Sequence, residues 1–280
     1  MLHIWKMEGL GNNYIYVNAL EQVPPDPEGL ARRMSEPYTG CFSDGLILIL
    51  KSEQADFRMR MFNSDGSESP MCGNGLRCVA KFCHDLGLTD KRDFVVETGA
   101  GLKHVYLTLG EDGSTRLVRA DMGSHRLSGE EIPSLAQGSP VVDVPLEAGG
   151  RTRLFTLVNM GNPHAVCFVE DPDREPVEVD GPLLERHPFF PLKANIEFVQ
   201  VLSPNHVKMR VWERGTGETR ACGTGACAVA VACALKGLTG RRVQVDLPGG
   251  PLQVFWEEET NLVWQEGPAR FVYEGNWLGD

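Results

Sequence analysis

One stretch of the chain occurs twice: Cys72-Gly73-Asn74-Gly75 recurs as Cys222-Gly223-Thr224-Gly225, 150 residues later. The same offset aligns residues far outside these tetrapeptides, without a gap. The further matches are Gly11-Asn12 with Gly161-Asn162, Met59-Arg60 with Met209-Arg210, Glu68 with Glu218, Val79-Ala80 with Val229-Ala230, Cys83 with Cys233, and Gly87-Leu88 with Gly237-Leu238. A self-match at a fixed offset identifies two copies of one structural unit. We therefore expect a pseudo-twofold molecule whose two cysteines face one shared cleft.

The composition is that of a soluble enzyme or binding protein with two domains. A chain of 280 residues suits two cores of ordinary size, and 42% hydrophobic with 23% charged residues is typical of globular proteins. A net charge of −11 disfavours binding to nucleic acid or to an anionic membrane. The N-terminal residues lack the apolar region of a signal peptide. The longest apolar run, Ala226 to Leu235, is about half the length that spans a bilayer. We expect a cytoplasmic protein.

Eight cysteines raise the alternatives of a disulfide framework and a zinc site. The chain is long and not dense in cysteine, which disfavours disulfides. Zinc ligands come as closely spaced pairs, but a helix that begins at each glycine turn would bury Cys78 and Cys227 in its core. We therefore expect no metal. The cysteines outside the two tetrapeptides are interpreted as small buried hydrophobic residues: Cys41, Cys78, Cys83, Cys167, Cys227 and Cys233.

Hydrophobic periodicity predicts the same order of elements in both copies. In the first copy we expect a short helix over 28–35 and strands near 4–7, 14–17, 46–50, 56–62, 94–97, 103–109 and 116–121. In the second copy we expect strands near 154–158, 165–169, 195–201, 206–212, 243–247, 252–257 and 262–265. Residues 270–273 are expected to return to the first lobe.

The two repeated motifs each lead into a helix. After Cys72, apolar residues form a helical stripe from Leu76 onward, with Arg77, Lys81, His84 and Asp85 on the other side and Gly87 as the stop. After Cys222, the run from Ala226 to Leu235 is apolar on every side, which is typical of a helix enclosed all round. The predicted fold is therefore of the α/β class (α+β type). It has two pseudo-symmetric lobes, each a mostly antiparallel sheet curled around one central helix.

The expected domain boundaries follow from this reading. The N-terminal lobe covers 1–122 and is joined by the C-terminal strand 268–280. A Gly/Pro/Ser-rich linker or crossover covers 123–149, and the C-terminal lobe covers 150–267.

A cysteine at the first turn of a helix points to proton-transfer chemistry. Free backbone N–H groups and the helix dipole favour the thiolate there. The neighbouring glycines let an anion approach the amides closely. A substrate carboxylate gripped between two such helix ends would place its α-carbon between the sulfurs, where one thiolate removes the α-proton and one thiol protonates the far face. Neither a GxGxxG turn nor a lysine suited to a Schiff base was found, so we expect cofactor-free inversion of a stereocentre.

Six motifs, in order along nearly the whole chain, give the sequence a strong resemblance to one family. They are Gly9-Leu10-Gly11-Asn12, Asn63-x-Asp65-Gly66-Ser67-Glu68, Cys72-Gly73-Asn74-Gly75-x-Arg77-Cys78, Gly161-Asn162-Pro163-His164, Glu213-Arg214-Gly215-x-Gly217-Glu218-Thr219 and Ala221-Cys222-Gly223-Thr224-Gly225. Together they resemble the diaminopimelate epimerases, which are cofactor-independent two-cysteine isomerases of lysine and peptidoglycan-precursor biosynthesis.

The resemblance implies a role for each matched residue. Cys72 and Cys222 correspond to the acid/base pair, and His164 and Glu213 to residues that tune the protonation of the cysteines. The residues implied to bind the substrate are Asn12, Asn63, Gly73, Asn74, Asn162, Asn195, Glu213, Arg214, Gly223 and Thr224. The planar guanidinium of Arg214 suits the distal carboxylate of diaminopimelate. The resemblance also implies a homodimer, and the net charge predicts a protein that binds no nucleic acid or membrane.

The resemblance is incomplete, and other interpretations stay open. Asn13 stands where many relatives carry Asp, and Gly45 stands where some carry Gln. The asparagines could be ordinary turn residues, His164 a loop histidine and Arg214 a surface charge. The main functional alternative is a racemase of the same fold that acts on another amino acid, such as histidine or proline. A thiol redox protein and a non-catalytic amino-acid-binding module are the alternatives from other classes.

Overall fold

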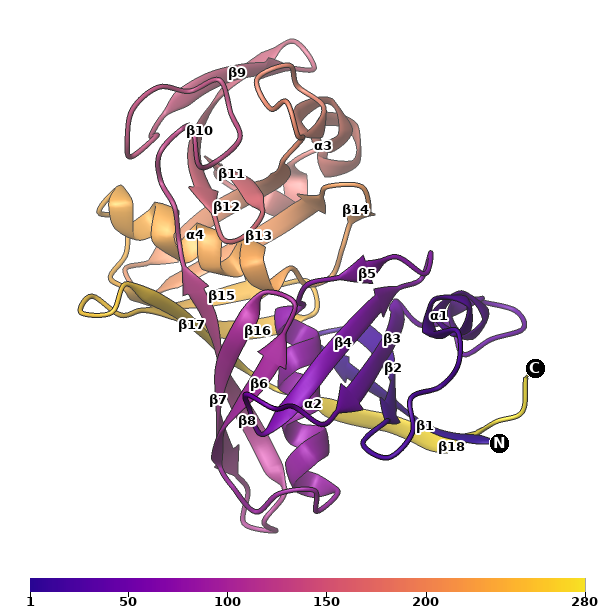
Figure 1. Cartoon of the computed structure of the whole chain (residues 1–280). Coiled ribbons are helices and arrows are strands. Elements are labelled where there is room, and N and C mark those ends of the chain that lie inside the picture. The colour runs from indigo at the N-terminus through magenta and orange to yellow at the C-terminus, as the bar shows by residue number, and fades with distance from the viewer. Residues whose placement is uncertain (280) are drawn as a thin grey trace. The chain divides into compact units, whose positions relative to one another are not determined.

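The computed structural model describes residues 1–279. The chain divides into two compact units, which are described separately. Unit 1 comprises Met1–Asp121 together with the C-terminal segment from Glu266, and unit 2 comprises Met122–Gln265. Figure 1 labels the elements of both.

Unit 1 is a curled sheet with two helices. The helices are α1 (Pro27–Ser35) and α2 (Gly73–Asp85). The strands are β1 (Leu2–Gly9), β2 (Asn12–Asn18), β3 (Gly45–Leu50), β4 (Phe57–Asn63), β5 (Glu68–Ser69), β6 (Asp93–Thr98), β7 (Gly101–Leu109), β8 (Thr115–Ser124) and β18 (Arg270–Trp277). Neighbouring strands follow the order β18-β1-β2-β3-β4-β6-β7-β8. Only β2–β3 and β4–β6 are parallel.

Unit 2 repeats this topology. Its helices are α3 (Val177–Glu185) and α4 (Gly223–Leu235), with a short 3₁₀ turn at Pro172–Arg174. Its strands are β9 (Val144–Ala148), β10 (Arg151–Asn159), β11 (Pro163–Phe168), β12 (Asn195–Ser203), β13 (His206–Glu213), β14 (Gly217–Glu218), β15 (Arg242–Leu247), β16 (Gly250–Trp256) and β17 (Leu262–Gly267). The order β9-β10-β11-β12-β13-β15-β16 again has two parallel neighbours, β11–β12 and β13–β15. The predicted fold class is therefore confirmed.

In each copy, the first strand also pairs with a strand that lies outside that copy in the sequence. β18, from the C-terminal end of the sequence, runs antiparallel to β1, with Leu2 opposite Trp277 and Trp5 opposite Glu274. β9, which precedes the second copy, pairs in the same way with β10. β18 therefore belongs to the same unit as β1.

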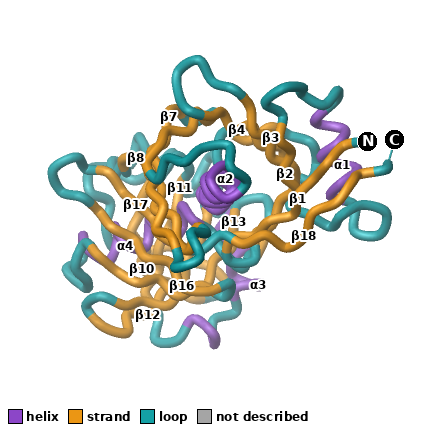
Figure 2. The backbone as a smooth tube through the Cα atoms, turned by 90° about the horizontal axis from the view of Figure 1, so that it is seen from below, coloured by secondary structure: helices purple, strands orange, loops and turns teal. Residues whose placement is uncertain are grey.

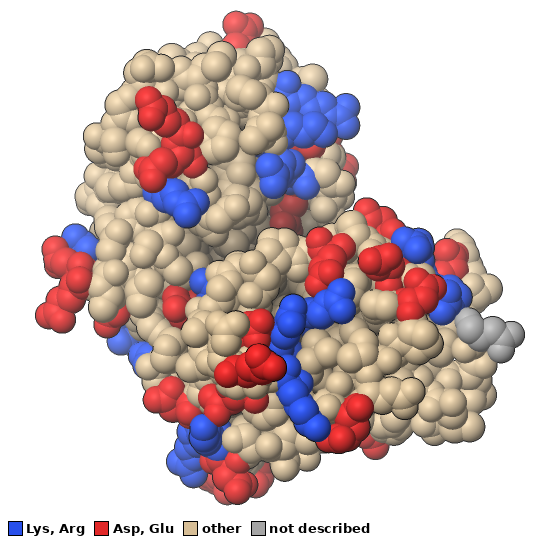
Figure 3. Space-filling model, viewed as in Figure 1, with Lys and Arg blue, Asp and Glu red and all other residues tan. Residues whose placement is uncertain are grey.

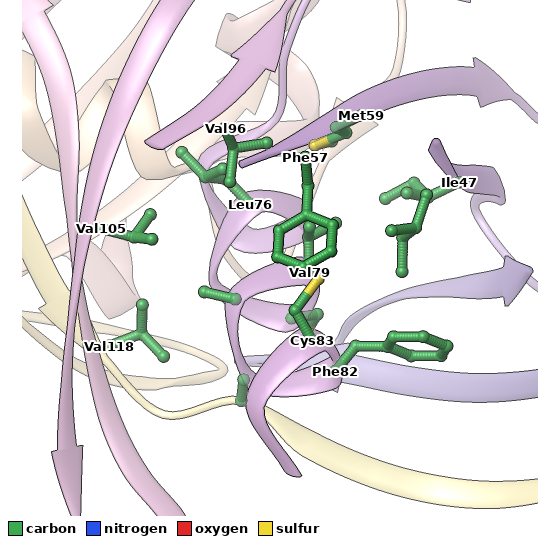
Figure 4. Close-up of a cluster of buried hydrophobic side chains, with 14 of the residues drawn as sticks. Ile47, Phe57, Met59, Leu76, Val79, Phe82, Cys83, Val96, Val105 and Val118 are labelled. Atoms are coloured by element: carbon green, nitrogen blue, oxygen red, sulfur yellow. The ribbon is translucent and has the colours of Figure 1, made fainter. Parts of the chain in front are cut away.

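α2 forms the centre of unit 1. Figure 2 views this helix nearly end-on, with strands of the unit around it. Its apolar side chains pack against the inner face of the sheet (Figure 4), where Leu76, Val79 and Cys83 contact a cluster that includes Ile47 and Phe57. Burial of this apolar surface supplies most of the stability of such a unit.

The first two residues on the polar side of α2, Arg77 and Lys81, are buried. Arg77 is fully buried and Lys81 is 9% exposed, because the sheet curls round the helix on every side. The Lys81 ammonium group donates to Asp85 Oδ2 and to the Thr115 carbonyl, so its charge is paired. α4 is likewise buried over most of its length, as the all-round apolar pattern predicted.

Three further features differ from the sequence-based expectations. Helix α3 was not predicted, although it lies at the repeat position of α1. The segment 123–149 is part of unit 2 and not an extended linker, because it contributes β9 and the buried side chains of Ile132 and Val141. Cys41 is only half-buried, whereas the other five cysteines outside the tetrapeptides are buried.

Charged side chains of both signs are interspersed on the face shown in Figure 3. Among residues 1–279, none of the helices combines the length and the apolar character that a membrane crossing requires.

Candidate active site

Cys72 is the N-cap residue of α2. Its backbone is extended (φ −132°, ψ 124°), and its Sγ accepts a hydrogen bond from the Gly75 amide at 3.5 Å. The helix begins at Gly73, whose amide is among the free N–H groups of the first turn. A small anion at this position would meet N–H donors and the positive end of the helix dipole.

A polar network surrounds Cys72 in unit 1. The thiol lies 3.3 Å from Asn12 Oδ1, and Asn74 Nδ2 donates to the same oxygen at 3.4 Å. The Asn12 amide group in turn donates to Asp44 Oδ2 at 2.9 Å. Asn74 itself accepts from the buried Arg77 guanidinium at 2.9 Å. Three of the residues chosen from the sequence, Cys72, Asn12 and Asn74, are therefore brought together.

Asn63 stands apart from this network. Its side chain donates to Ser67 Oγ at 3.0 Å, and its backbone closes the turn to Gly66 and Ser67. These contacts fit the alternative interpretation of Asn63 as an ordinary turn residue. Gly45 is also explained by the fold, since a Cβ there would lie 2.0 Å from the Phe62 carbonyl oxygen.

Cys222 is the N-cap residue of α4 and the counterpart of Cys72. Its Sγ accepts from the Gly225 amide at 3.4 Å and lies 3.5 Å from Thr224 Oγ1. Unlike Cys72, it is buried, with 4% of its surface exposed. Burial, and then the Glu213 and Glu197 carboxylates, hold the pKa of this thiol well above its ordinary value. This environment favours the thiol form of Cys222 over the thiolate.

His164 lies on β11 and is completely buried. Its Nδ1 is 2.6 Å from Glu197 Oε1, and its Nε2 is 3.0 Å from Asn162 Oδ1. Burial raises the pKa of the Glu197 carboxyl group, and the His164 ring opposes that rise. His164 is thus a structured buried residue and not a loop histidine.

Asn195 begins β12, and Glu213 and Arg214 lie at the end of β13 and directly after it. The Asn195 carboxamide links two backbones, since it donates to the Pro163 carbonyl at 3.0 Å and accepts from the Arg214 amide at 2.8 Å. Glu213 Oε1 accepts from Thr219 Oγ1 at 2.5 Å. The Arg214 guanidinium donates to the Leu192 carbonyl at 3.1 Å. Asn195 therefore fixes the loop that presents Glu213 and Arg214.

Sequence reasoning missed several polar groups near the two cysteines. Glu197 was read as part of a strand, Arg77 was placed only on the polar side of its helix, and Asp44 was not considered. Gln265 was likewise overlooked: it is fully buried, and a Cβ on Gly223 would lie 2.9 Å from its Oε1. The repeat could have shown Glu197 and Arg77, because their counterparts are the apolar residues Ile47 and Cys227.

Each unit therefore presents a thiol at a helix N-terminus with amide donors beside it. Such a half-site can bind an anionic group and exchange one proton. In the described part of the chain, no three His, Cys, Asp or Glu side chains are grouped so that they could hold a metal ion.

Known proteins match this chain over nearly its whole length. The diaminopimelate epimerase family model matches residues 4–128 and 156–272. A diaminopimelate epimerase of Methanococcus maripaludis is 51% identical over 270 residues, covering 96% of this chain and 97% of its own. That of Moorella thermoacetica is 51% identical over 277 residues, covering 99% of each chain.

Solved structures share the fold at much lower identity. A phenazine biosynthesis protein of the PhzF family from Bacillus anthracis has a TM-score of 0.70 at 19% identity, covering 99% of each chain. A probable proline racemase from Agrobacterium radiobacter has a TM-score of 0.73 at 16% identity, covering 100% of this chain and 94% of its own. Both comparisons concern the fold alone.

Proposed function

The chain belongs to the diaminopimelate epimerase family, and from that membership we propose that it interconverts LL- and meso-diaminopimelate. It is then an isomerase of lysine and peptidoglycan-precursor biosynthesis that needs no cofactor. The observation that carries the proposal is 51% identity over nearly the whole length to enzymes with this name. The duplicated N-cap cysteines supply the chemistry.

In the proposed mechanism, the half-sites of the two units face one substrate molecule. The thiol groups of Cys72 and Cys222 act on opposite faces of the α-carbon, so that one removes a proton and the other delivers one. The amides at Gly73-Asn74 and Gly223-Thr224 bind the α-carboxylate and stabilise the negative charge that develops on it.

The electrostatics of unit 2 support a division of labour between the cysteines. Because burial and two carboxylates favour the thiol form of Cys222, Cys222 is assigned as the proton donor in one direction of the reaction. Cys72 then removes the α-proton in that direction, and the roles reverse for the return reaction.

The other proposed contacts hold the substrate in one orientation. Asn12, Asn74 and Asn162 present carboxamides near the half-sites, and Asn63 supplies another from its turn. Asn195 holds the loop of Glu213 and Arg214, whose charges suit an ammonium group and the distal carboxylate of diaminopimelate. Glu213 and His164 also tune the protonation of the cysteines. This set of contacts favours a substrate with a polar far end and therefore disfavours proline.

An isotope-exchange assay tests the function. LL-diaminopimelate is incubated with the reduced enzyme in D2O, and we expect deuterium at the α-carbon together with the meso isomer. Histidine and proline are assayed in parallel. Absence of exchange with folded enzyme would refute the proposal, and faster racemisation of histidine or proline would establish the alternative racemase.

The proposal includes a homodimer in the cytoplasm, as the family resemblance implies. Light scattering coupled to gel filtration should then give twice the mass of one chain. A single-chain mass at assay concentrations would refute the dimer without affecting the proposed reaction.

A further inference from the structure

Glu197 and His164 form a buried pair beside the unit 2 thiol. Glu197 lies on β12 and His164 on the parallel neighbour β11. The Nδ1–Oε1 distance is 2.6 Å, and neither side chain has any exposed surface. The second carboxylate oxygen of Glu197, Oε2, is buried and has no hydrogen-bond partner among the residues described.

The carboxylate lies against the first turn of α4. A Cβ added to Gly225 would be 3.0 Å from Glu197 Oε1 and 3.2 Å from Cys222 Sγ. The carboxylate and the sulfur therefore both border the space that a side chain at this position would occupy. A larger residue at this position would separate the two groups or displace them.

The repeat shows that packing alone does not require a carboxylate there. The counterpart of Glu197 is Ile47, which is fully buried against the counterpart glycine: a Cβ on Gly75 would lie 2.8 Å from Ile47 Cδ1. The same site of the same scaffold is thus filled by an aliphatic side chain in unit 1. A buried carboxylate with an unpaired oxygen is costly, so its presence in unit 2 indicates a role beyond packing.

We propose that Glu197 is a positioning residue that holds a hydrogen on Nδ1 of His164. In this proposal Glu197 is ionised; an ionised carboxylate can only accept a hydrogen bond, so the ring nitrogen that faces it carries the hydrogen. The ring is then fixed with Nε2 directed at the Asn162 carboxamide, 3.0 Å away, and Asn162 is itself one of the proposed substrate contacts. This is the arrangement by which a buried carboxylate orients a histidine in hydrolase triads. The inference rests on the proposed function, because it assigns to Glu197 the role of orienting His164, a residue of the proposed site.

Nitrogen NMR tests the tautomer directly. In enzyme labelled with ¹⁵N-histidine, the His164 signals are identified by their loss in His164→Gln. We expect a hydrogen-bearing Nδ1 in the parent and a redistribution of the hydrogen between the two nitrogens in Glu197→Ile, the variant that copies unit 1. A parent Nδ1 without hydrogen, or identical His164 signals in the two proteins, would overturn the inference. Neither readout depends on which substrate the enzyme takes.

Kinetics separate positioning from folding. Loss of the oriented ring should lower kcat of Glu197→Ile about tenfold or more with little change in KM. Glu197→Gln retains an acceptor oxygen and should recover most of the activity. Asp180→Asn is the matched control, since Asp180 is also a buried unit 2 carboxylate and accepts from Arg153 at 2.7 Å; this change should lower Tm and leave kcat unchanged. Parent-like kcat in Glu197→Ile, or a kcat loss in Asp180→Asn as large as that in Glu197→Ile, would contradict the positioning role. If the parent shows the Nδ1 hydrogen but does not epimerise diaminopimelate, the proposed function fails and the tautomer assignment stands.

Discussion

The Arg77 guanidinium donates from Nη2 to Asn74 Oδ1 at 2.9 Å, inside unit 1 and out of contact with solvent. Its Nε also donates to the Pro268 carbonyl at 3.2 Å. One buried cation therefore ties together α2, the Asn74 carboxamide and the segment that leads into β18. At the equivalent position α4 has Cys227, so only one of the two thiols has such a cation on its helix.

Replacing Arg77 with Met should destabilise the protein. The change leaves Asn74 Oδ1 and the Pro268 carbonyl without this charged donor, and we expect a loss of about 2–4 kcal/mol in the free energy of unfolding. Urea denaturation measures it. Arg116→Met, at an exposed position of β8, is the control and should change little. Equal midpoints for the two variants would show that the buried contacts contribute nothing.

The cysteines should separate into catalytic and structural classes. Cys72→Ala and Cys222→Ala should abolish α-proton exchange while both proteins remain folded by circular dichroism. Cys83 lies in the α2 core, so Cys83→Ala should retain turnover and lose roughly 1 kcal/mol of stability. Retained exchange in either N-cap variant would rule out the two-thiol mechanism.

Buried thiols should make the fold sensitive to alkali. Burial raises the pKa values of Cys78, Cys167 and Cys233 to about 12, whereas an unfolded thiol ionises near pH 8.5. Above about pH 9 the unfolded chain loses these protons and the folded chain keeps them. The stabilising contribution of each buried thiol is thus fully present below the unfolded pKa. It falls by about 1.4 kcal/mol per thiol for each pH unit as the pH rises toward the pKa values of the folded state.

Unfolding in urea and reductant at pH 8, 9 and 10 measures this slope. Cys233→Ala removes one buried thiol, so its slope should be shallower than that of the parent by one thiol's share. Parallel slopes for the two proteins would mean that Cys233 ionises alike in both states.

Gln265 should be a site where substitution stabilises the protein. Both polar atoms of its fully buried amide lack hydrogen-bond partners within residues 1–279. Methionine has a similar volume and no amide to desolvate, so Gln265→Met should raise the free energy of unfolding by about 1–2 kcal/mol. Thermal unfolding measures the change in stability. Gln253→Met is the control, because it makes the same exchange at a glutamine that is hydrogen-bonded. A lower Tm for Gln265→Met would indicate that the amide has a partner in solution.

Most of the fold could be predicted from the sequence, because the spacing of apolar residues is periodic and recurs in both copies. The helices α2 and α4 and nearly all long strands could be placed from apolar spacing and glycine stops. α3 was missed because its own pattern is weak, although the 150-residue offset from α1 marks its place. The burial of Arg77 could not be read from α2 alone, because it depends on how far the sheet closes round the helix.

The candidate site also contains residues that a local sequence pattern reveals and residues that only the fold brings together. Cys72 and Cys222 stand out because two cysteines share a rare glycine context at one repeat position. The contacts of Asn195 with Pro163 and Arg214 join three separate segments of sequence, which no local pattern encodes. Glu197 looked like an ordinary strand residue, since burial of a carboxylate is a property of the folded neighbourhood.

The position of β18 has a consequence for biosynthesis. Residues 270–277 leave the ribosome after the whole of unit 2, yet they pair with β1, which is made before unit 2. Unit 2 has all its residues by Gln265, whereas β1 lacks its β18 partner until residues 270–277 have been made. Multidomain chains generally fold from the N-terminus as they are made; here the earlier-made half is completed last.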